Sequence, residues 1–577
     1  MATTETQESP NAAPIYGKLS FYVLLLLVFG MAVGYASTYF AGASAGPFDA
    51  KVNAGDTGWV LTASALVMLM TPLVGVFYGG LVTSKNVISL IKQSLLILAV
   101  ISIQWVVFGY SLVFGTDFHG IIGELNFFGL SGVGYAPNSA YAATIPQLAF
   151  MIFQAMGAVI APALILGSIV ERVRFRTLVV FVLVWSTFVY DPIAHWVWGT
   201  GGWLHSMGAL DFAGGAAVHA SAGFSGLAAA IVIGHRRNFK IGEAIASHNV
   251  PFVLIGAAVL WFGWLGFNGG SALAASPVAV NALVVTNTSG AAGALVWMLL
   301  SWAENKKPSA MATAIGAVCG LIAITPASGY VGPVASIAIG TIAGLVTYLA
   351  LHLRSKFFPI DDTLDVWAAH GMGGVTGLIL TGIFAEKAIN GGAADGLLFG
   401  NPGQLGIQVL VALVTLVYAF VATVIILKLL APLGLRVSRQ EEEEGLDLAV
   451  HGEEAYRFGI SPSTSEGMAQ KVIAERIEQL EERTAQIRMQ VELQSDDLRS
   501  RLQTETGELR LQLQTESADL RQRLQIAQLE AQNSELRRRL DELNGDSRQR
   551  QDTYTSLRAY KQFVVPDASR RTGSLPF

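Results

Sequence analysis

Long apolar segments constrain the fold of this chain more than any other feature. A transmembrane helix needs about 20 mostly apolar residues, and eleven apolar segments here fit a bilayer crossing. We therefore predict an all-α polytopic membrane protein with eleven transmembrane helices. The predicted spans are residues 57–80, 86–114, 142–170, 174–194, 212–234, 246–267, 280–301, 309–324, 331–352, 364–385 and 404–432.

Charge divides the chain into two parts. Charged residues make up 14% of the whole sequence, against about 25% in soluble domains, but 47 of the 142 residues from 436 to 577 are charged. We therefore expect a membrane body and a polar tail. The net charge of −5 gives no nucleic-acid signature. With one cysteine, Cys319, and no metal or cofactor motif, we expect no bound cofactor or metal.

Lysine and arginine residues set the predicted orientation. Positive residues concentrate in cytoplasmic loops, and alternate loops carry fourteen of them, whereas the opposite loops carry only Lys51 and Lys387. This pattern predicts a cytoplasmic C-terminus. The fourteen are Lys85, Lys92, Arg172, Arg174, Arg176, Arg236, Arg237, Lys240, Lys306, Lys307, Arg354, Lys356, Arg436 and Arg439.

A further apolar stretch, residues 20–41, precedes the eleven spans. It fits a signal peptide that is cleaved near Ala43-Ser44-Ala45, or a retained signal anchor that forms a twelfth span. Both interpretations leave residue 50 outside. We assign residues 1–45 to this segment and residues 46–435 to the membrane domain.

Two segments 151 residues apart share the pattern H-x-x-x-G-x-[S/T]-G-L, from His219 and from His370. An aspartate precedes each histidine, Asp211 by eight residues and Asp365 by five. The segments fall in the fifth and tenth spans. Because five spans per half is an odd number, the pattern predicts two inverted five-helix repeats, with the eleventh span outside them.

Ionisable groups at membrane depth indicate function by default. We expect His219 and His370 to share a site near the midplane, where neutral imidazoles offer a donor and an acceptor to a small polar guest. The alternatives are two structural histidines, or a metal site with Asp211, which is a poor ligand set. Ser225 lies in a G-x-S-G pattern of intramembrane serine proteases, but Thr376 replaces it in the repeat, which favours packing.

Several outer residues suggest a cation-binding mouth. Asp211 begins its span, where it fits a helix N-cap and also provides negative potential. Trp198 fits either an interfacial aromatic or a cation–π platform. Phe267 and Ser271 end the sixth span on the same side, so the serine hydroxyl could hold a small cation beside the tryptophan.

Together these residues resemble the ammonium transporter family (Amt/Mep/Rh), in its bacterial type, over about residues 57–458. The segments that carry the resemblance are Phe77–Leu81 with Lys85-Asn86, Glu171–Phe175, Pro192–His195 with Trp198-Gly199, Gly208–Gly215 with His219, Gly266–Ser271, Asp361-Asp362, Asp365–His370, Thr381–Phe384, Glu444–Asp447 and His451–Tyr456.

The resemblance implies a homotrimer in the lipid of the plasma (cell inner) membrane, with one pore per subunit, that transports ammonium or ammonia and accepts methylammonium as an analogue. It implies a transporter and not an enzyme. Trp198 and Ser271 would form the outer vestibule, with Asp211 supporting it. Phe267 would be a gating ring, and His219 and His370 the pore histidines.

One position departs from the family pattern. The second gating phenylalanine falls on Gly157, in a register fixed by Phe153-Gln154 and by Gly167 before Glu171. Phe153, one turn away on the same face, could fill part of the gap. We expect transport to survive. The alternative is an ammonium sensor with little flux.

The tail repeats with a period of eleven residues. Leucines recur at 498, 509 and 520 and at 502, 513 and 524, after heptad spacing from Ile473 to Val491. We predict a regulatory region over 436–465, a parallel three-stranded coiled coil over 466–545 and an unstructured end over 546–577. A lone charged helix is the alternative. The extension could couple the pore to a partner, hold the trimer together or space a PII-type regulator.

Overall fold

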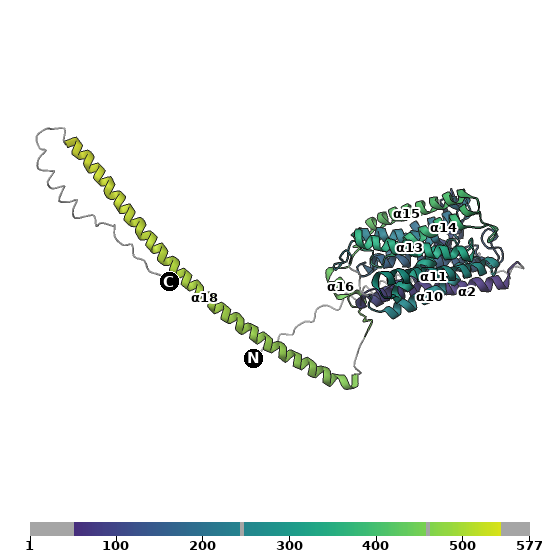
Figure 1. Cartoon of the computed structure of the whole chain (residues 1–577), viewed down its shortest axis with the longest axis horizontal. Helices are drawn as coiled ribbons and strands as arrows, with labels where there is room; N and C mark the ends of the chain where they lie inside the picture. Colours follow the sequence, from purple (N-terminus) through teal and green to yellow (C-terminus); the bar gives the residue numbers. More distant parts are fainter. Residues whose placement is uncertain (1–50, 243–246, 457–461, 544–577) are drawn as a thin grey trace, which may run out of the picture. The chain divides into compact units, whose positions relative to one another are not determined.

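The computed structural model describes residues 51–242, 247–456 and 462–543 (Figure 1). The chain divides into two units, Met1–Arg457 and Phe458–Phe577. The first holds the apolar helices and the second holds one long helix. The predicted signal segment, residues 1–45, and the predicted unstructured end, residues 546–577, lie outside the described residues.

The first unit is helical, as the apolar segments predicted. Within the described residues, ten helices are long and apolar enough to cross a membrane. The segment predicted as the span 309–324 is α12, a shorter apolar helix of 15 residues, so the count of eleven stays a prediction. The ten candidates are Ala54–Leu81, Ser84–Phe114, Gln147–Ile169, Phe175–Ser206, Gly215–Ile233, Val250–Gly270, Pro277–Asn305, Pro333–Phe357, Trp367–Phe384 and Pro402–Leu433.

Several of these candidates combine more than one element. The helices of the first unit are α2 (Ala54–Leu81), α3 (Val87–Gln104), α4 (Tyr110–Phe114), α5 (Gln147–Ile169), α6 (Phe175–Trp185), α7 (Asp191–Trp198), α8 (Trp203–Ser206), α9 (Ser221–Ile233), α10 (Val250–Gly270), α11 (Pro277–Asn305), α12 (Ala310–Ile324), α13 (Pro333–Phe357), α14 (Gly373–Phe384), α15 (Pro402–Leu430), α16 (Arg439–Glu444) and α17 (Leu446–His451).

Short elements join or interrupt the long helices. Four of those in the described ranges are π-helical turns: η2 (Trp105–Gly109), η4 (Ser186–Tyr190), η5 (Gly215–Ala220) and η6 (Trp367–Met372). The 3-10 turns are η1 (Ser84–Asn86), η3 (Leu125–Leu130), η7 (Leu397–Phe399) and η8 (Ala431–Leu433). Strands β1 (Asp117–Phe118) and β2 (Ile122–Gly123) form an antiparallel pair in the loop before α5.

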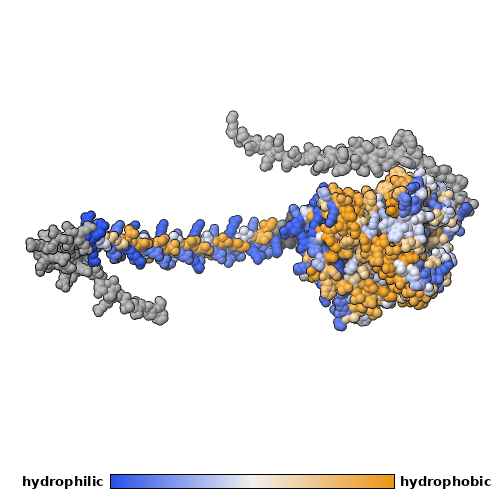
Figure 2. All heavy atoms as spheres, turned by 90° about the horizontal axis from the view of Figure 1, so that it is seen from above, coloured by the Kyte–Doolittle hydropathy of each residue, from blue (hydrophilic) through white to orange (hydrophobic). Residues whose placement is uncertain are grey.

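The outer surface of the first unit is apolar over a broad area (Figure 2). Large apolar side chains that a water-soluble protein would bury are exposed here, such as Val334 at 82% and Leu429 at 74%. An exposed apolar area of this extent fits contact with lipid or with another subunit. The structure therefore supports the multi-pass membrane assignment.

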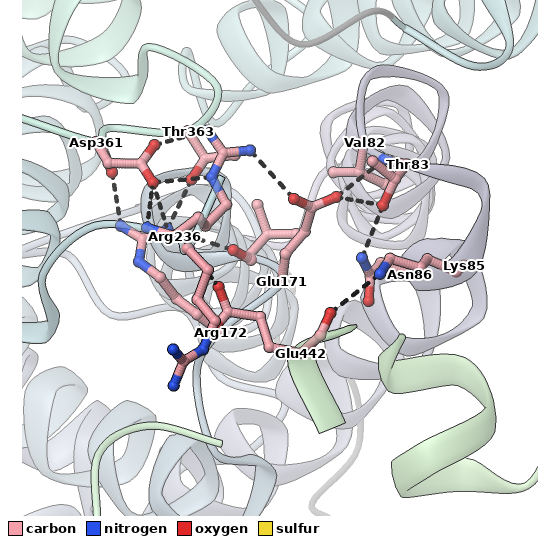
Figure 3. A network of polar contacts seen from close by, with 12 residues as sticks. Val82, Thr83, Lys85, Asn86, Glu171, Arg172, Arg236, Asp361, Thr363 and Glu442 are labelled. Carbon is pink, nitrogen blue, oxygen red and sulfur yellow. Dashed lines mark hydrogen bonds and ion pairs between the residues drawn. The ribbon is translucent and has the colours of Figure 1, made fainter. Parts of the chain in front are cut away.

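Buried charges connect the loops at one end of this unit (Figure 3). Glu171 accepts hydrogen bonds from the backbone and hydroxyl of Thr83 at 2.9 and 2.6 Å and pairs with Arg236 at 3.1 Å. Arg236 also pairs with Asp361 at 2.7 Å. Arg172 is fully buried and donates to the carbonyls of Gly234 and Asp361. The loops after α2, α5, α9 and α13 therefore meet here.

Opposite charge outweighs burial in setting the pKa values of the two acids. Burial alone would raise the pKa of Glu171, but the Arg236 guanidinium and the bonds from Thr83 hold the pKa below its usual value. Burial likewise opposes ionisation of Asp361, and the bonds from Arg236 together with the charge of Arg172 hold its pKa below the usual value. Both carboxylates are therefore ionised at neutral pH.

The segment after α15 docks onto the same end. Glu442 pairs with Arg436 at 2.7 Å and accepts the backbone N–H of Arg237 at 2.8 Å. Asp447 accepts the N–H groups of Ile88 and Ser89 at 3.0 and 2.7 Å, at the first turn of α3. The predicted regulatory region is thus folded against the membrane unit as far as residue 456.

The second unit is the single helix α18 (Pro462–Leu543), 82 residues long. Its apolar side chains form one line along the helix (Figure 2), and the six repeat leucines are 56–63% exposed in this single chain. Ion pairs Asp497–Arg501 and Asp519–Arg523 lie 22 residues apart, two periods of the predicted repeat. The long helix is confirmed, whereas the three-stranded coiled coil stays a prediction.

Candidate functional site

The two predicted histidines meet in the interior of the membrane unit. Their Nδ1 atoms are 3.3 Å apart and their ring centroids 5.4 Å apart, with the rings inclined by 28°. His219 is 2% and His370 5% exposed. A hydrogen bond between two Nδ1 atoms needs one protonated and one bare nitrogen. The pair therefore presents one Nε2 donor and one Nε2 acceptor when neutral.

Glycines of the repeated pattern explain this close approach. Each histidine lies in a π-helical turn, η5 or η6, and a glycine follows it by four residues. A Cβ on Gly374 would lie 2.8 Å from the backbone nitrogen of Ala220 and 3.1 Å from the Cβ of His219. A Cβ on Gly223 would collide with the backbone of Gly371. The absence of side chains thus lets the two histidine segments touch.

Aromatic rings surround His219. Trp264 is stacked on it at 5.4 Å and 26°, and Phe267 approaches at 6.4 Å and 82°. The indole of Trp264 donates to Thr325 at 2.9 Å, which fixes its plane. The Nε2 atom of His219 is buried and has no protein partner within the described structure. A small polar guest could bind there in otherwise apolar surroundings.

Asp211 caps the π-helical turn that carries His219. Its two carboxylate oxygens accept the backbone N–H groups of residues 214, 215, 216 and 217 at 2.5–3.2 Å. This confirms the N-cap interpretation. Within the described residues, Asp211 and the two histidines do not form a group that could hold a metal ion.

In the segment that carries His370, the aspartate equivalent to Asp211 is Asp362. The sequence-based prediction of Asp365 for this place was wrong. Asp362 precedes His370 by eight residues, the same spacing as Asp211 and His219. Its Oδ2 accepts the N–H of Trp367, the first residue of η6, at 2.7 Å. Asp365 instead pairs with Arg354. Equal spacing to the histidine was the signal that could have identified Asp362.

The residues expected at the outer mouth occupy neighbouring elements. The indole of Trp198 donates to the Asp211 carbonyl at 2.7 Å, and the Ser271 hydroxyl donates to the Phe267 carbonyl at 2.9 Å. The ring of Phe153 packs where a Cβ of Gly270 would lie. Gln154 is half-buried in α5. Within the described residues no hydrogen bond or ring contact joins Trp198 to Ser271, so a shared vestibule stays a prediction.

Ser225 has a structural position. Its hydroxyl accepts from the indole of Trp185 and from the Thr423 hydroxyl, both at 2.8 Å. The serine is fully buried, and these two partners lie on α6 and α15 rather than beside His219. Ser225 therefore packs helices together, as its replacement by Thr376 in the repeat had suggested.

These features define the class of protein: a polytopic membrane protein with a buried histidine pair where two similar helical segments cross. The model of the Ammonium Transporter Family matches residues 58–456. The chain belongs to this family, whose members are transporters rather than enzymes.

Named relatives match this chain over the membrane unit. The ammonium transporter Amt1 of Archaeoglobus fulgidus is 48% identical over 403 residues, which cover 70% of this chain and 99% of the archaeal protein. The Bacillus subtilis ammonium transporter is 46% identical over 404 residues, covering 70% and 98%. The crystal structure of Saccharomyces cerevisiae Mep2 matches with a TM-score of 0.65 at 36% identity, covering 71% of this chain and 93% of Mep2.

A further solved structure with the same fold is that of a protein named Sensor Amt Protein. It matches with a TM-score of 0.63 at 31% identity and covers 69% of this chain and 98% of that protein. The fold therefore occurs both in proteins named transporters and in a protein named a sensor.

Proposed function

We propose that this chain conducts ammonium-derived ammonia through a pore lined by His219 and His370, with or without a separately moved proton. The observation that carries the proposal is the buried histidine pair with the unpartnered Nε2 of His219. A bare ammonium ion is costly to place among apolar side chains. A neutral guest that both donates and accepts hydrogen bonds matches the pair.

The outer residues fit recruitment of the cation before it loses its proton. We assign Trp198 and Ser271 to the vestibule, Phe267 to the gating ring between the vestibule and the histidines, and Phe153 with Gln154 to the pore lining near the gate. Asp211 holds η5 in place and adds negative charge at the mouth. The ring of Phe267 contacts that of His219, which supports a place for Phe267 next to the histidines along the proposed pore.

We propose a homotrimer in the plasma membrane with the C-terminus in the cytoplasm. The fourteen positive loop residues support this orientation, and three of them, Lys85, Arg172 and Arg236, belong to the polar network drawn in Figure 3. Residues 46–435 form the pore domain, residues 436–465 the regulatory region and residues 466–545 the coiled coil. A PII-type protein is the proposed cytosolic regulator.

A sensor with little flux is the second candidate. Two observations favour it: no side chain fills the position of Gly157, and α18 extends far beyond the family match at residue 456. A sensor would bind ammonium and change its tail without transporting.

Transport by protein reconstituted in liposomes tests the proposal. We expect a saturating ammonium-induced current, or methylammonium uptake if transport is electroneutral, that His219→Ala and His370→Ala abolish or alter. His205→Ala, at an exposed outer position, is the matched control and should behave like the parent. Flux that neither pore substitution changes would contradict the twin-histidine pathway. Ammonium binding without flux would support the sensor.

A further inference from the structure

Gly157, in the middle of α5, borders unfilled space in the protein interior. The residue is buried, yet a Cβ built on it would have only one neighbouring atom within 4 Å outside the adjacent backbone. Every other buried glycine in the described ranges would place its Cβ near at least three atoms. Because protein interiors are close-packed, this glycine marks a gap.

The single neighbour is the hydroxyl of Tyr190, 3.2 Å from the Cβ position. Tyr190 is fully buried at the end of η4. Its hydroxyl has no hydrogen-bond partner within the described structure. Buried hydroxyls are nearly always satisfied, so a hydroxyl that faces a gap without a partner indicates a missing polar guest.

The gap lies at the depth of Phe267. The end of α5 and the start of α10 lie at the same end of the unit, because Glu171 bonds Thr83 and Asn249 bonds Gly80 around the end of α2. At the other end, the Phe153 ring packs against Gly270. From that contact, Gly157 lies four residues inward and Phe267 three, about 6 and 4.5 Å at the helical rise.

We infer that the Tyr190 hydroxyl and the space beside Gly157 form a binding position for ammonium or ammonia, one aromatic layer outside His219. The phenolic oxygen accepts a hydrogen bond from the N–H of the guest, which passes on toward the unpartnered Nε2 of His219. A polar binding position thus lies at a depth where a layer of apolar rings alone would exclude the guest. This inference rests on the proposed pore function.

Two substitutions test this position. Tyr190→Phe keeps the ring and removes the acceptor, so the ammonium concentration for half-maximal flux should rise about 2- to 10-fold, the effect of one hydrogen bond. Gly157→Ala adds a methyl group that points toward the Tyr190 hydroxyl. It should raise the ammonium concentration for half-maximal flux by a similar factor. Neither change should lower the melting temperature, because one removes an unpartnered buried hydroxyl and the other replaces a mid-helix glycine.

Tyr110→Phe is the matched control. Tyr110 packs edge-on against the same Trp105 ring as Tyr190, but its hydroxyl accepts a hydrogen bond from Gln147 at 3.0 Å. Tyr110→Phe removes this hydrogen bond, so it should lower the melting temperature and leave the half-maximal ammonium concentration unchanged. A structural role for Tyr190 would give the same pattern as Tyr110.

Ammonium-induced stabilisation of the purified protein, against sodium at equal ionic strength, separates the two proposals. A parent without flux whose stabilisation disappears in Tyr190→Phe would support the binding position and overturn transport. An unchanged half-maximal concentration and unchanged stabilisation in Tyr190→Phe would overturn the binding position and leave transport standing. A parent with neither flux nor stabilisation would overturn both.

Discussion

At the level of single residues, glycine and aspartate determine where the histidines lie. Gly223 and Gly374 remove the side chains that would separate the two histidine segments. Asp211 and Asp362 hold the first turns of η5 and η6. The two buried histidines are thus positioned mainly by these glycines and aspartates.

The first prediction concerns Gly374→Ala. Its methyl group would lie 2.8 Å from a backbone nitrogen that cannot move away, so we expect a loss of about 1–3 kcal/mol in stability. Separation of the histidines should reduce ammonium flux as well. Thermal unfolding and liposome transport measure the two effects.

The matched control for Gly374→Ala is Gly406→Ala in α15. This glycine is exposed, and a Cβ there would meet nothing within 4 Å. Alanine is the better helix former by about 1 kcal/mol, so stability should stay equal or rise and flux should not change. Equal effects of the two substitutions would contradict the close-approach argument.

At the level of helices and turns, ten of the eleven predicted spans correspond to helices in the described residues that are long and apolar enough to cross a membrane. The predicted span 309–324 matches α12 almost residue for residue, and serine or asparagine N-caps begin several helices, as Ser309 does for α12. The four π-helical turns were not predicted, because an extra residue in one turn leaves no mark in an apolar pattern. Two of these turns carry the histidines.

The second prediction concerns α18. Glutamate at Leu502, Leu513 and Leu524 places charges in the apolar line, so the proposed three-stranded coiled coil should dissociate. In the full-length protein, chemical crosslinking between tails should fall and protease cleavage within 466–545 should rise. The membrane unit should keep its ammonium flux.

The control for α18 is glutamate at Gln503, Gln514 and Gln525, each one residue from a substituted leucine and off the apolar line. These changes add the same charge at neighbouring exposed positions. Crosslinking and cleavage should match the parent. Identical behaviour of the leucine and glutamine variants would indicate a lone charged helix.

In the molecule as a whole, the charge network joins the loops and residues 436–456 into one folded end. Glu171 and Asp361 are ionised there because Arg236 contacts both. A carboxyl group whose pKa is lower in the folded state stabilises the fold above its unfolded pKa, and that stabilisation is lost as pH falls through the folded value.

The third prediction is therefore acid sensitivity. The melting temperature of the membrane unit should fall as pH drops below the ordinary pKa values of 4.5 for Glu171 and 3.8 for Asp361. Glu171→Gln should melt lower at pH 7 and show a weaker dependence between pH 7 and 3. Glu124→Gln, at an exposed position, is the control. A pH profile of Glu171→Gln parallel to that of the parent would contradict the network argument.

The helical membrane body, the family, the histidine pair and the long tail helix could all be predicted from the order of the amino acids. Each depends on a signal that is local or repeated along the chain: apolar length, loop charge, spacing to a histidine or an eleven-residue period. Physical constraints of the bilayer make those signals strong, because backbone groups in lipid must be satisfied within helices.

Which groups meet could be seen only in the folded molecule. The distance between His219 and His370 and the position of the Tyr190 hydroxyl beside Gly157 both depend on contacts between helices distant in sequence. A missing ring at Gly157 is visible in the sequence, but what faces the gap is not. Packing of separate helices places that hydroxyl, and no local pattern encodes it.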